Sequence, residues 1–343
     1  MIKQNRNKEY DKKIAFHTSV IIGFAILLLL IIVVSLNTGY VKLSPLDTLS
    51  TLFGGGGEKE KLILFSFRMP RIVLSMLVGV GLAMSGCIIQ NISKNDLADP
   101  GLLGINAGAG LVVILYVMFF GSQSFLSIFT LPFLSLIGAG LTAILIYFLA
   151  FRKRRRSSSF NLVLNGVAVQ AGISALTTVL VIKLDETQFD FVASWQAGSI
   201  WGSNWKFVWA LLPWLLLLIP YVMSKSNVLN ILDLDNDVAR GLGVNIEKER
   251  RGLLAASVAL AASSVAVSGS ISFVGLLAPH LARKIVGPKH NILLPTCALT
   301  GAVLVSGADA IARVLLQPTE IPTGIAVAVI GAPYLLYLLI KGK

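Results

Sequence analysis

The run of residues between Arg71 and Lys94 limits most strongly how this chain can fold. It holds roughly twenty residues without a charge, the length that an α-helix needs to cross the hydrocarbon core of a bilayer. Arg68, Pro70 and Arg71 precede the run, and a polar turn at 94–100 follows it. The run therefore predicts a membrane-crossing helix with a polar group at each end.

The composition of the whole chain agrees with a membrane protein. Its 343 residues are 55% hydrophobic and only 13% charged, with a mean hydropathy of +0.80, whereas soluble proteins carry about 25% charged residues. The net charge of +12 comes from short basic clusters between apolar runs. This pattern is typical of cytoplasmic loops in membrane proteins and argues against a nucleic-acid partner.

The apolar runs predict an all-α protein with ten transmembrane helices, both termini in the cytoplasm and a single transmembrane domain at 1–343. The expected spans are about 14–36, 72–92, 102–120, a fourth that ends at 151, 160–182, 207–223, 252–268, 271–286, 292–315 and 323–340. A basic tail at 1–13 and five consecutive cationic residues at 152–156 mark the cytoplasmic side. The first run is too long for the apolar region of a signal peptide, so we expect an uncleaved first span.

The sequence gives no sign of catalysis, a cofactor or a bound metal. Cys87 and Cys297 lie within apolar runs, and the three histidines have no metal-ligand spacing. The glycines at 54–57 lack the following lysine and hydroxyl residue of a phosphate-binding loop, and predict a flexible turn. The alternating aspartates at 233–237 lack the glycine and glutamate of a calcium loop. Any ATP hydrolysis must then come from another polypeptide, since the chain has no phosphate-binding loop.

The fifth expected span is unusually polar. Polar side chains are costly in lipid, so they are expected to face other helices or water. Hydrogen bonding between helices and the lining of a pore explain them equally well from the residues alone. The polar residues are Asn161, Asn165, Gln170, Ser174, Thr177 and Thr178.

Two connections between spans have a distinctive composition. Residues 183–206 carry three of the five tryptophans and predict a short helix at the membrane surface. Residues 226–251 form the longest expected cytoplasmic connection. They predict two short amphipathic helices broken at 241–243, with Val238, Leu242 and Val244 able to fill a groove on another protein.

Two pairs of charged residues suggest polar contacts. Arg68 and Arg71 lie one turn apart at an expected membrane surface, where guanidinium groups suit the carboxylates of an acidic partner. Snorkelling of both side chains to the membrane surface is an equally good explanation from this segment alone. Asp309 and Arg313 are four residues apart, which predicts an ion pair along one helix face.

Three segments together resemble one known family. They are RMPR with the following G-x-x-LA-x-SG, the turn KNDLADPGLLG at 94–104 and the block GSISFVGLLAPHLARKIVGPKHNILLP at 269–295. This wording resembles the permease subunits of iron-siderophore and cobalamin ABC importers, the FecCD type. Asp96 stands where that family usually has proline, so the rigidity of the turn in this chain is an open question.

The resemblance implies a fold, a cargo and a set of partners. The fold would be that of a type II ABC importer permease, in a bacterial cell membrane. The cargo would be a ferric siderophore, with cobalamin or haem as the alternative. The partners would be a dimer of ABC ATPase subunits, an extracytoplasmic substrate-binding protein, the lipid bilayer, and a second permease that is either an identical copy or a paralogue.

The resemblance also implies roles for individual residues. The outer cluster that receives acidic residues of the binding protein would consist of Arg68, Arg71 and Arg313. Residues 226–251 would dock into the ATPase through Asp237, Ala239, Arg240, Gly241, Leu242 and Gly243. The cytoplasmic gate would contain Asn95 and Leu97. The translocation pathway would be lined by Asn165, Gln170, Ser174 and Thr177.

A secondary transporter driven by protons or sodium is the alternative from another class. Such transporters usually carry ionisable residues at mid-membrane depth. Asp309 is the only acidic residue well inside an expected span, and Arg313 lies beside it. A membrane-embedded enzyme finds no support, because the spans contain no paired acids and no nucleophile with a neighbouring base.

Overall fold

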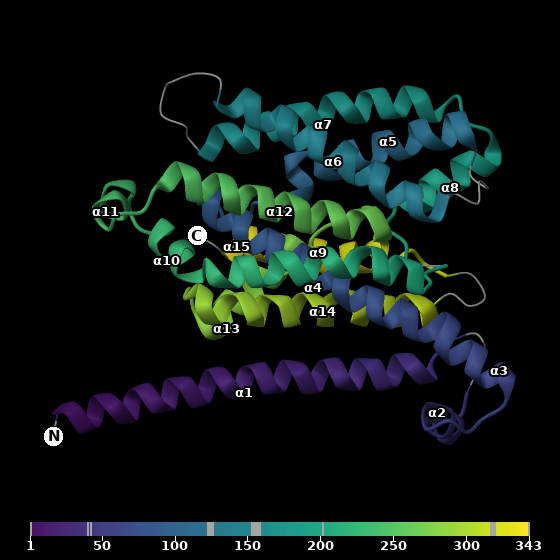
Figure 1. The fold of residues 1–343 in the computed structure, drawn as a ribbon, viewed down its shortest axis with the longest axis horizontal. Helices are drawn as coiled ribbons and strands as arrows, with labels where there is room; N and C mark the ends of the chain where they lie inside the picture. Colours follow the sequence, from purple (N-terminus) through teal and green to yellow (C-terminus); the bar gives the residue numbers. More distant parts are fainter. Residues whose placement is uncertain are drawn as a thin grey trace.

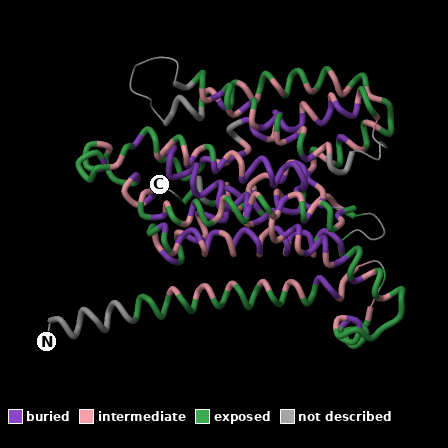
Figure 2. The backbone as a smooth tube through the Cα atoms, in the orientation of Figure 1, coloured by how far each residue is buried: buried purple, intermediate pink, exposed green. Residues whose placement is uncertain are grey.

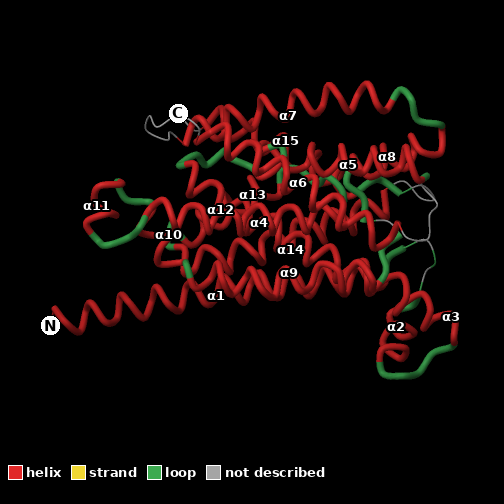
Figure 3. Tube along the Cα trace, turned by 45° about the horizontal axis from the view of Figure 1, so that its top comes forward, coloured by secondary structure: helices red, strands yellow, loops and turns green. Residues whose placement is uncertain are grey.

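The computed structural model describes residues 2–39, 41, 43–121, 127–151, 159–200, 202–315 and 320–341. Within these ranges the regular secondary structure is entirely helical (Figure 3). The long helices run side by side in one bundle, with α1 along one edge and α7 along another (Figure 1).

The helices have the following bounds in chain order. They are α1 (Ile2–Asn37), α2 (Pro45–Leu52), α3 (Glu58–Lys61), a π-helical segment (Leu62–Arg68), α4 (Met69–Ser93), a 3₁₀ turn (Pro100–Leu103), α5 (Ile105–Phe120), α6 (Ser127–Phe151), α7 (Ser159–Val181), α8 (Glu186–Gln196), α9 (Trp205–Ser224), α10 (Ser226–Leu232), α11 (Asn236–Gly241), α12 (Ile246–Ser268), α13 (Val274–Val286), α14 (His290–Leu315) and α15 (Thr323–Lys341).

Each of the ten expected spans coincides with one of these helices. Among the described residues, seven helices are long and apolar enough to cross a membrane, namely α1, α4, α6, α7, α9, α12 and α14. The other three, α5, α13 and α15, are shorter. Residues 2–13 of the expected polar tail are part of helix α1, and the short helix expected within 183–206 is α8.

The two ends of the bundle differ in what they carry. Figure 1 shows both chain termini at the end that holds α10 and α11, whereas α2, α3 and α8 lie at the opposite end. We call these the α11 end and the α8 end. The basic cluster at 152–156, on which the expected orientation depends, lies outside the described residues.

Helix α4 forms the centre of the bundle (Figure 2) and packs against α12, α13 and α14. Small residues let the backbones touch. A Cβ atom added to Gly79 would lie 2.2 Å from the carbonyl oxygen of Gly301 on α14, and one added to Gly86 would lie 1.9 Å from that of Gly275 on α13. Contact this close between helix backbones is typical of membrane bundles and requires glycine at these positions.

The segment before α4 differs from its predicted form. The sequence predicts a loop over residues 37–65, but the structure places α2, α3 and most of the π-helical segment there. The helical backbone therefore continues from Glu58 through Ser93. Pro70 has no N–H, so the carbonyl four residues before it loses its usual donor, and a wider turn is a common local adjustment. The glycines at 54–57 form the turn between α2 and α3, as expected.

The break within residues 226–251 lies elsewhere than the sequence predicts. The two short helices are separated at residues 233–235, whereas Gly241 ends α11 and precedes the start of α12 at Ile246. The Asp235 side chain accepts a hydrogen bond from the backbone N–H of Asn236 and so fixes the start of α11. Gly243 has φ +81°, a conformation that favours glycine, so it redirects the chain into α12.

Candidate functional site

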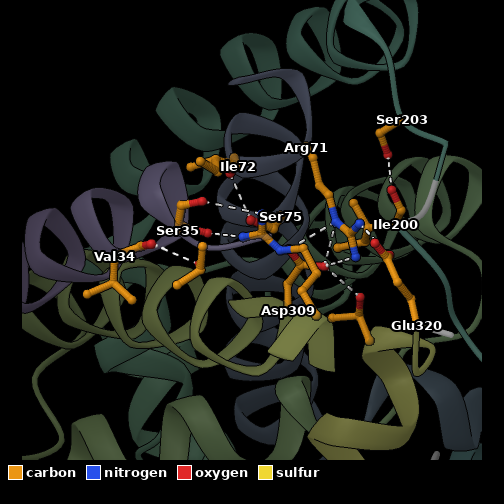
Figure 4. Close-up of polar contacts among 12 residues, drawn as sticks. Val34, Ser35, Arg71, Ile72, Ser75, Ile200, Ser203, Asp309 and Glu320 are labelled. Atoms are coloured by element: carbon orange, nitrogen blue, oxygen red, sulfur yellow. Dashed lines mark hydrogen bonds and ion pairs between the residues drawn. The ribbon is translucent and has the colours of Figure 1, made fainter. Parts of the chain in front are cut away.

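A buried ion pair joins α4 to α14 at the α8 end (Figure 4). Arg71 Nε lies 3.0 and 3.1 Å from the two carboxylate oxygens of Asp309, and Nη2 lies 2.9 Å from Oδ1. Thr323, at the start of α15, also donates to Oδ1 at 3.0 Å. The Asp309 side chain is 1% exposed. Because a buried carboxylate is costly without partners, these contacts make the charge tolerable in the bundle.

Arg71 also contacts a second carboxylate. Its Nη1 lies 2.6 Å from Glu320 Oε2, just before α15, and the Glu320 side chain is 29% exposed. Figure 4 shows the Arg71 guanidinium between Asp309 and Glu320. The edge of the guanidinium with Nε and Nη2 is therefore held in the bundle by Asp309, and Nη1 contacts Glu320, which reaches the surface.

Arg313 and Arg68 both hold the last turn of α1. Arg313 forms the expected ion pair with Asp309, at 3.3 Å between Nε and Oδ2, and its Nη atoms donate to the carbonyl oxygen and the hydroxyl of Ser35. Arg68 donates to the carbonyl oxygens of Leu36 and Val41. Cationic side chains suit the free carbonyls at a helix C-terminus, so these two arginines anchor α1 on the bundle.

The structure thus gathers the three arginines that the family resemblance assigns to docking. Arg68, Arg71 and Arg313 are 6%, 8% and 5% exposed. Three positive charges face the two carboxylates of Asp309 and Glu320, which leaves one net positive charge in this cluster of five residues. In this conformation the guanidinium groups contact the chain's own groups, and their contact with another protein stays a prediction.

The turn after α4 holds the expected gate residues close together at the α11 end. Asn95 Oδ1 accepts a hydrogen bond from the Leu97 N–H at 3.0 Å, and Leu97 is 38% exposed. Asp96, in place of the usual proline, forms an ion pair with Arg283 of α13. The turn is therefore tied to a neighbouring helix by charge. Its role as a gate stays a prediction.

Asp99 ends the same turn and starts the 3₁₀ helix. Its Oδ2 accepts a hydrogen bond from the Gly101 N–H at 2.9 Å. Burial nevertheless raises the pKa of Asp99 to about 6, because desolvation outweighs the lowering by that hydrogen bond. Asp99 is an ionisable group that the family resemblance does not single out.

The expected coupling residues lie on the short helix α11 and in the two positions that follow it. Asp237 and Arg240 form an exposed ion pair at 3.5 Å, Leu242 is 59% exposed and Ala239 is buried. Asp237, Arg240 and Gly243 border a hollow of about 940 Å³ beside α11 and the start of α12. A Cβ atom added to Gly241 or Gly243 would have no other atom within 4 Å. Helix α11 is therefore accessible at the tip of the α11 end.

The expected pathway residues lie on α7 at the edge of the bundle. Asn165, Gln170 and Thr177 are half-buried and Ser174 is exposed, while the side chain of Asn161 lies outside the described part of the chain. Much of α7 is exposed (Figure 2). One chain alone therefore does not enclose these four residues in a channel, and their pathway role stays a prediction.

Comparison with known proteins supports the family that the sequence resembles. The model of the FecCD transport family matches residues 27–341. The chain is 49% identical to the iron(3+)-hydroxamate import system permease protein FhuG of Bacillus subtilis over 330 residues, 94% of this chain and 98% of that one. It is 35% identical to the hemin transport system permease protein HmuU of Yersinia pestis over 326 residues, 94% of this chain and 96% of that one.

A solved structure has the same architecture. It is an inward-facing metal-chelate type ABC transporter, with a TM-score of 0.83, 32% sequence identity and coverage of 94% of this chain and 99% of that one. The apolar helices, the family match and this structural similarity agree on a multi-pass membrane protein. The chain therefore belongs to the FecCD transport family.

Proposed function

We propose that the chain is the permease subunit of an ATP-driven importer that carries a ferric siderophore across a bacterial cell membrane. The supporting observation is that the arginine cluster and residues 226–251 lie at opposite ends of the bundle. A permease must meet a delivery protein on one side and an ATPase on the other. An iron(3+)-hydroxamate permease as a relative over nearly the full length supports the choice of cargo.

In this proposal ten helices cross the membrane and the α11 end is cytoplasmic. The basic residues at 152–156 support that orientation through the positive-inside rule. The α8 end then faces outward, where the arginine cluster meets acidic residues of the substrate-binding protein. The short helix α11 docks into a groove of the ATPase.

In this proposal the polar residues of α7 are covered by a second permease. Asn165, Gln170, Ser174 and Thr177 lie on a helix that one chain leaves largely uncovered, and a second copy or a paralogue packed there would enclose them between two subunits. Polar residues inside a membrane are expected to face protein or water. The pathway in this proposal therefore runs between two permeases.

The environment of Asp309 favours an importer over an ion-coupled transporter. A proton- or sodium-binding carboxylate must exchange its ligand, whereas Asp309 is held by Arg71, Arg313 and Thr323 at distances of 2.9 to 3.3 Å. These three side chains occupy the carboxylate and leave it no free position for an ion. Asp309 thus serves as a structural counter-ion.

The test is uptake by cells that lack the chain and receive it back on a plasmid. Uptake of ⁵⁵Fe-ferrichrome that stops when ATP is depleted, and continues after the proton gradient is collapsed, supports the proposal. Uptake of haem or cobalamin, without uptake of ferrichrome, would show that the cargo is not a ferric hydroxamate siderophore. Uptake that follows the proton or sodium gradient without any ATPase would overturn the importer.

A second measurement addresses the arginine cluster. The variant Arg68→Glu with Arg71→Glu is expected to abolish import. Because both arginines have internal partners, membrane insertion is measured in parallel, and Arg68→Gln is included as a milder change that removes one charge. Unchanged import by the double variant would remove the docking assignment.

A further inference from the structure

The connector between α10 and α11, residues 233–235, is fastened to the end of α4. Asn91 Nδ2 donates to Asp233 Oδ1 at 2.6 Å and to the carbonyl oxygen of Leu229 at 3.1 Å. Lys94 Nζ donates to the carbonyl oxygen of Leu234 at 3.0 Å. The connector therefore touches the last turn of α4 through a side chain and through its backbone.

His290, the first residue of α14, holds the same connector from the other side. Its Nδ1 lies 3.5 Å from Asp233 Oδ2 and 3.1 Å from Asn230 Oδ1, and its backbone N–H donates to that oxygen at 2.8 Å. Its Nε2 lies 3.5 Å from Asn91 Nδ2. His290 is 1% exposed, whereas the Asp233 side chain is 44% exposed, so a buried histidine and Asn91 hold a carboxylate that reaches the surface of the α11 end.

The two helices that hold the connector are also joined at the α8 end. Arg71 of α4 and Asp309 of α14 form the buried ion pair described above. Between the two ends, Gly79 and Gly301 bring the backbones into contact, with no room for a Cβ atom on either. A pair of helices fastened at both ends and packed without gaps is expected to move as one body.

We propose that Asp233 is a positioning residue that transmits movement of residues 226–251 to the paired helices α4 and α14. The inference deepens the proposed function and rests on it. A displacement of α11 by the ATPase pulls on Asp233, which shifts Asn91 and His290 together. Lys94, the second contact to α4, directly precedes Asn95, so the same displacement reaches the turn that carries the expected gate.

The linkage works in both directions. The far ends of α4 and α14 carry Arg71, Asp309 and Arg313, so a carboxylate that binds there acts on the same two helices. Coupling between two sites is reciprocal. Docking of the binding protein therefore changes the position of Asp233 and of the ATPase contact.

The experiment uses the permease co-purified with its ATPase, and cells that carry the same variants. Asp233→Ala removes the contacts to Asn91 and His290. We expect assembly with the ATPase and the rate of ATP hydrolysis to stay within about twofold, while ⁵⁵Fe-ferrichrome uptake falls at least about tenfold, roughly 1.4 kcal/mol of lost coupling. Iron imported per ATP hydrolysed is the readout that a purely structural role would not change.

A double-variant cycle tests the contact itself. Asn91→Ala removes the α4 partner of Asp233, and the loss of uptake in Asn91→Ala with Asp233→Ala, on a logarithmic scale, is expected to be smaller than the sum of the two single losses, because both changes break the same contact. The control is Asp185→Ala at the α8 end. Asp185 also accepts two hydrogen bonds, from Gln188 N–H and Thr187 Oγ1, but lies far from the connector.

The outcomes separate the two levels of the proposal. The inference is overturned if Asp233→Ala lowers uptake and assembly with the ATPase together and leaves the iron imported per ATP unchanged. It is also overturned if this variant imports iron at the normal rate. Single losses that add up in full in the double variant also contradict it. Absence of ATP-dependent ferrichrome uptake by the unmodified chain refutes the proposed function and this inference with it.

Discussion

Glu320 and Asp309 hold opposite sides of the Arg71 guanidinium, and they differ in exposure. The Glu320 side chain is 29% exposed and contacts Nη1 at 2.6 Å, whereas the Asp309 side chain is 1% exposed. An incoming carboxylate can replace Glu320 without disturbing the buried pair. In the docking proposed above, an acidic residue of the substrate-binding protein would take the position that Glu320 occupies in this structure.

Glu320→Gln is expected to strengthen docking of the substrate-binding protein. Glutamine keeps an oxygen for Arg71 but removes the negative charge that competes with the partner. For a partly exposed pair the gain is about 0.5–1 kcal/mol, or roughly two- to fivefold in Kd. Surface binding measured at low and high salt checks this, because added salt should shrink the difference. Glu247→Gln, at the α11 end, is the control. Weaker docking by Glu320→Gln would contradict the idea that a carboxylate of the binding protein replaces Glu320 on Arg71.

Arg71→Met is expected to destabilise the isolated permease. It leaves Asp309 buried with Arg313 and Thr323 as its remaining partners, and loss of one partner of a buried pair usually costs about 3–5 kcal/mol. Because Arg313 and Thr323 still contact Asp309, we expect a loss of stability near the lower end of that range. Replacing the carboxylate as well, in Arg71→Met with Asp309→Leu, should recover most of the loss. Unfolding of the purified variants in detergent measures the cycle, and additive effects of the two changes would show that the pair is not coupled.

The positions of the seven long apolar helices were predictable because a bilayer requires about twenty uncharged residues for a crossing. The short helices were not. The helices within 37–65 carry no long apolar pattern. The cap at Asp235 is a local signal for the start of α11, but the contact of Asp233 with Asn91 joins residues 142 positions apart. Local sequence patterns contain no trace of such a distant partner.

The arginine cluster shows the same division between local and distant contacts. The pair of Asp309 and Arg313 follows from helical spacing, whereas Arg71 meets Asp309 across 238 residues. Asp96 is similar, because its partner Arg283 is 187 residues away. Sequence could place these charged residues at helix ends, but only the fold shows that they contact one another.

Gly243→Trp is expected to block association with the ATPase. Gly243 has φ +81° and open space around it, so a large side chain would project from the tip of the α11 end without an internal clash. Gly243→Ala isolates the backbone cost of about 1 kcal/mol for a left-handed residue and should leave association largely intact. Co-purification with the ATPase measures both variants. An intact complex with full transport by Gly243→Trp would exclude this residue from the ATPase contact.

Asp99 is expected to give the permease a pH-dependent stability. Its pKa is raised to about 6 from 3.8, so the folded state binds the proton more tightly than the unfolded state. Stability is then greatest below the unfolded pKa and falls as pH rises from about 4 to about 6. Asp99→Asn keeps the acceptor for the Gly101 N–H but cannot ionise. At pH 7 this variant should be more stable by about 1–3 kcal/mol, since a shift of about two units corresponds to at most about 3 kcal/mol. Thermal unfolding in detergent at pH 4.5 and pH 7 checks the effect, and an equal difference between the two proteins at both pH values would show that ionisation of Asp99 is not its cause.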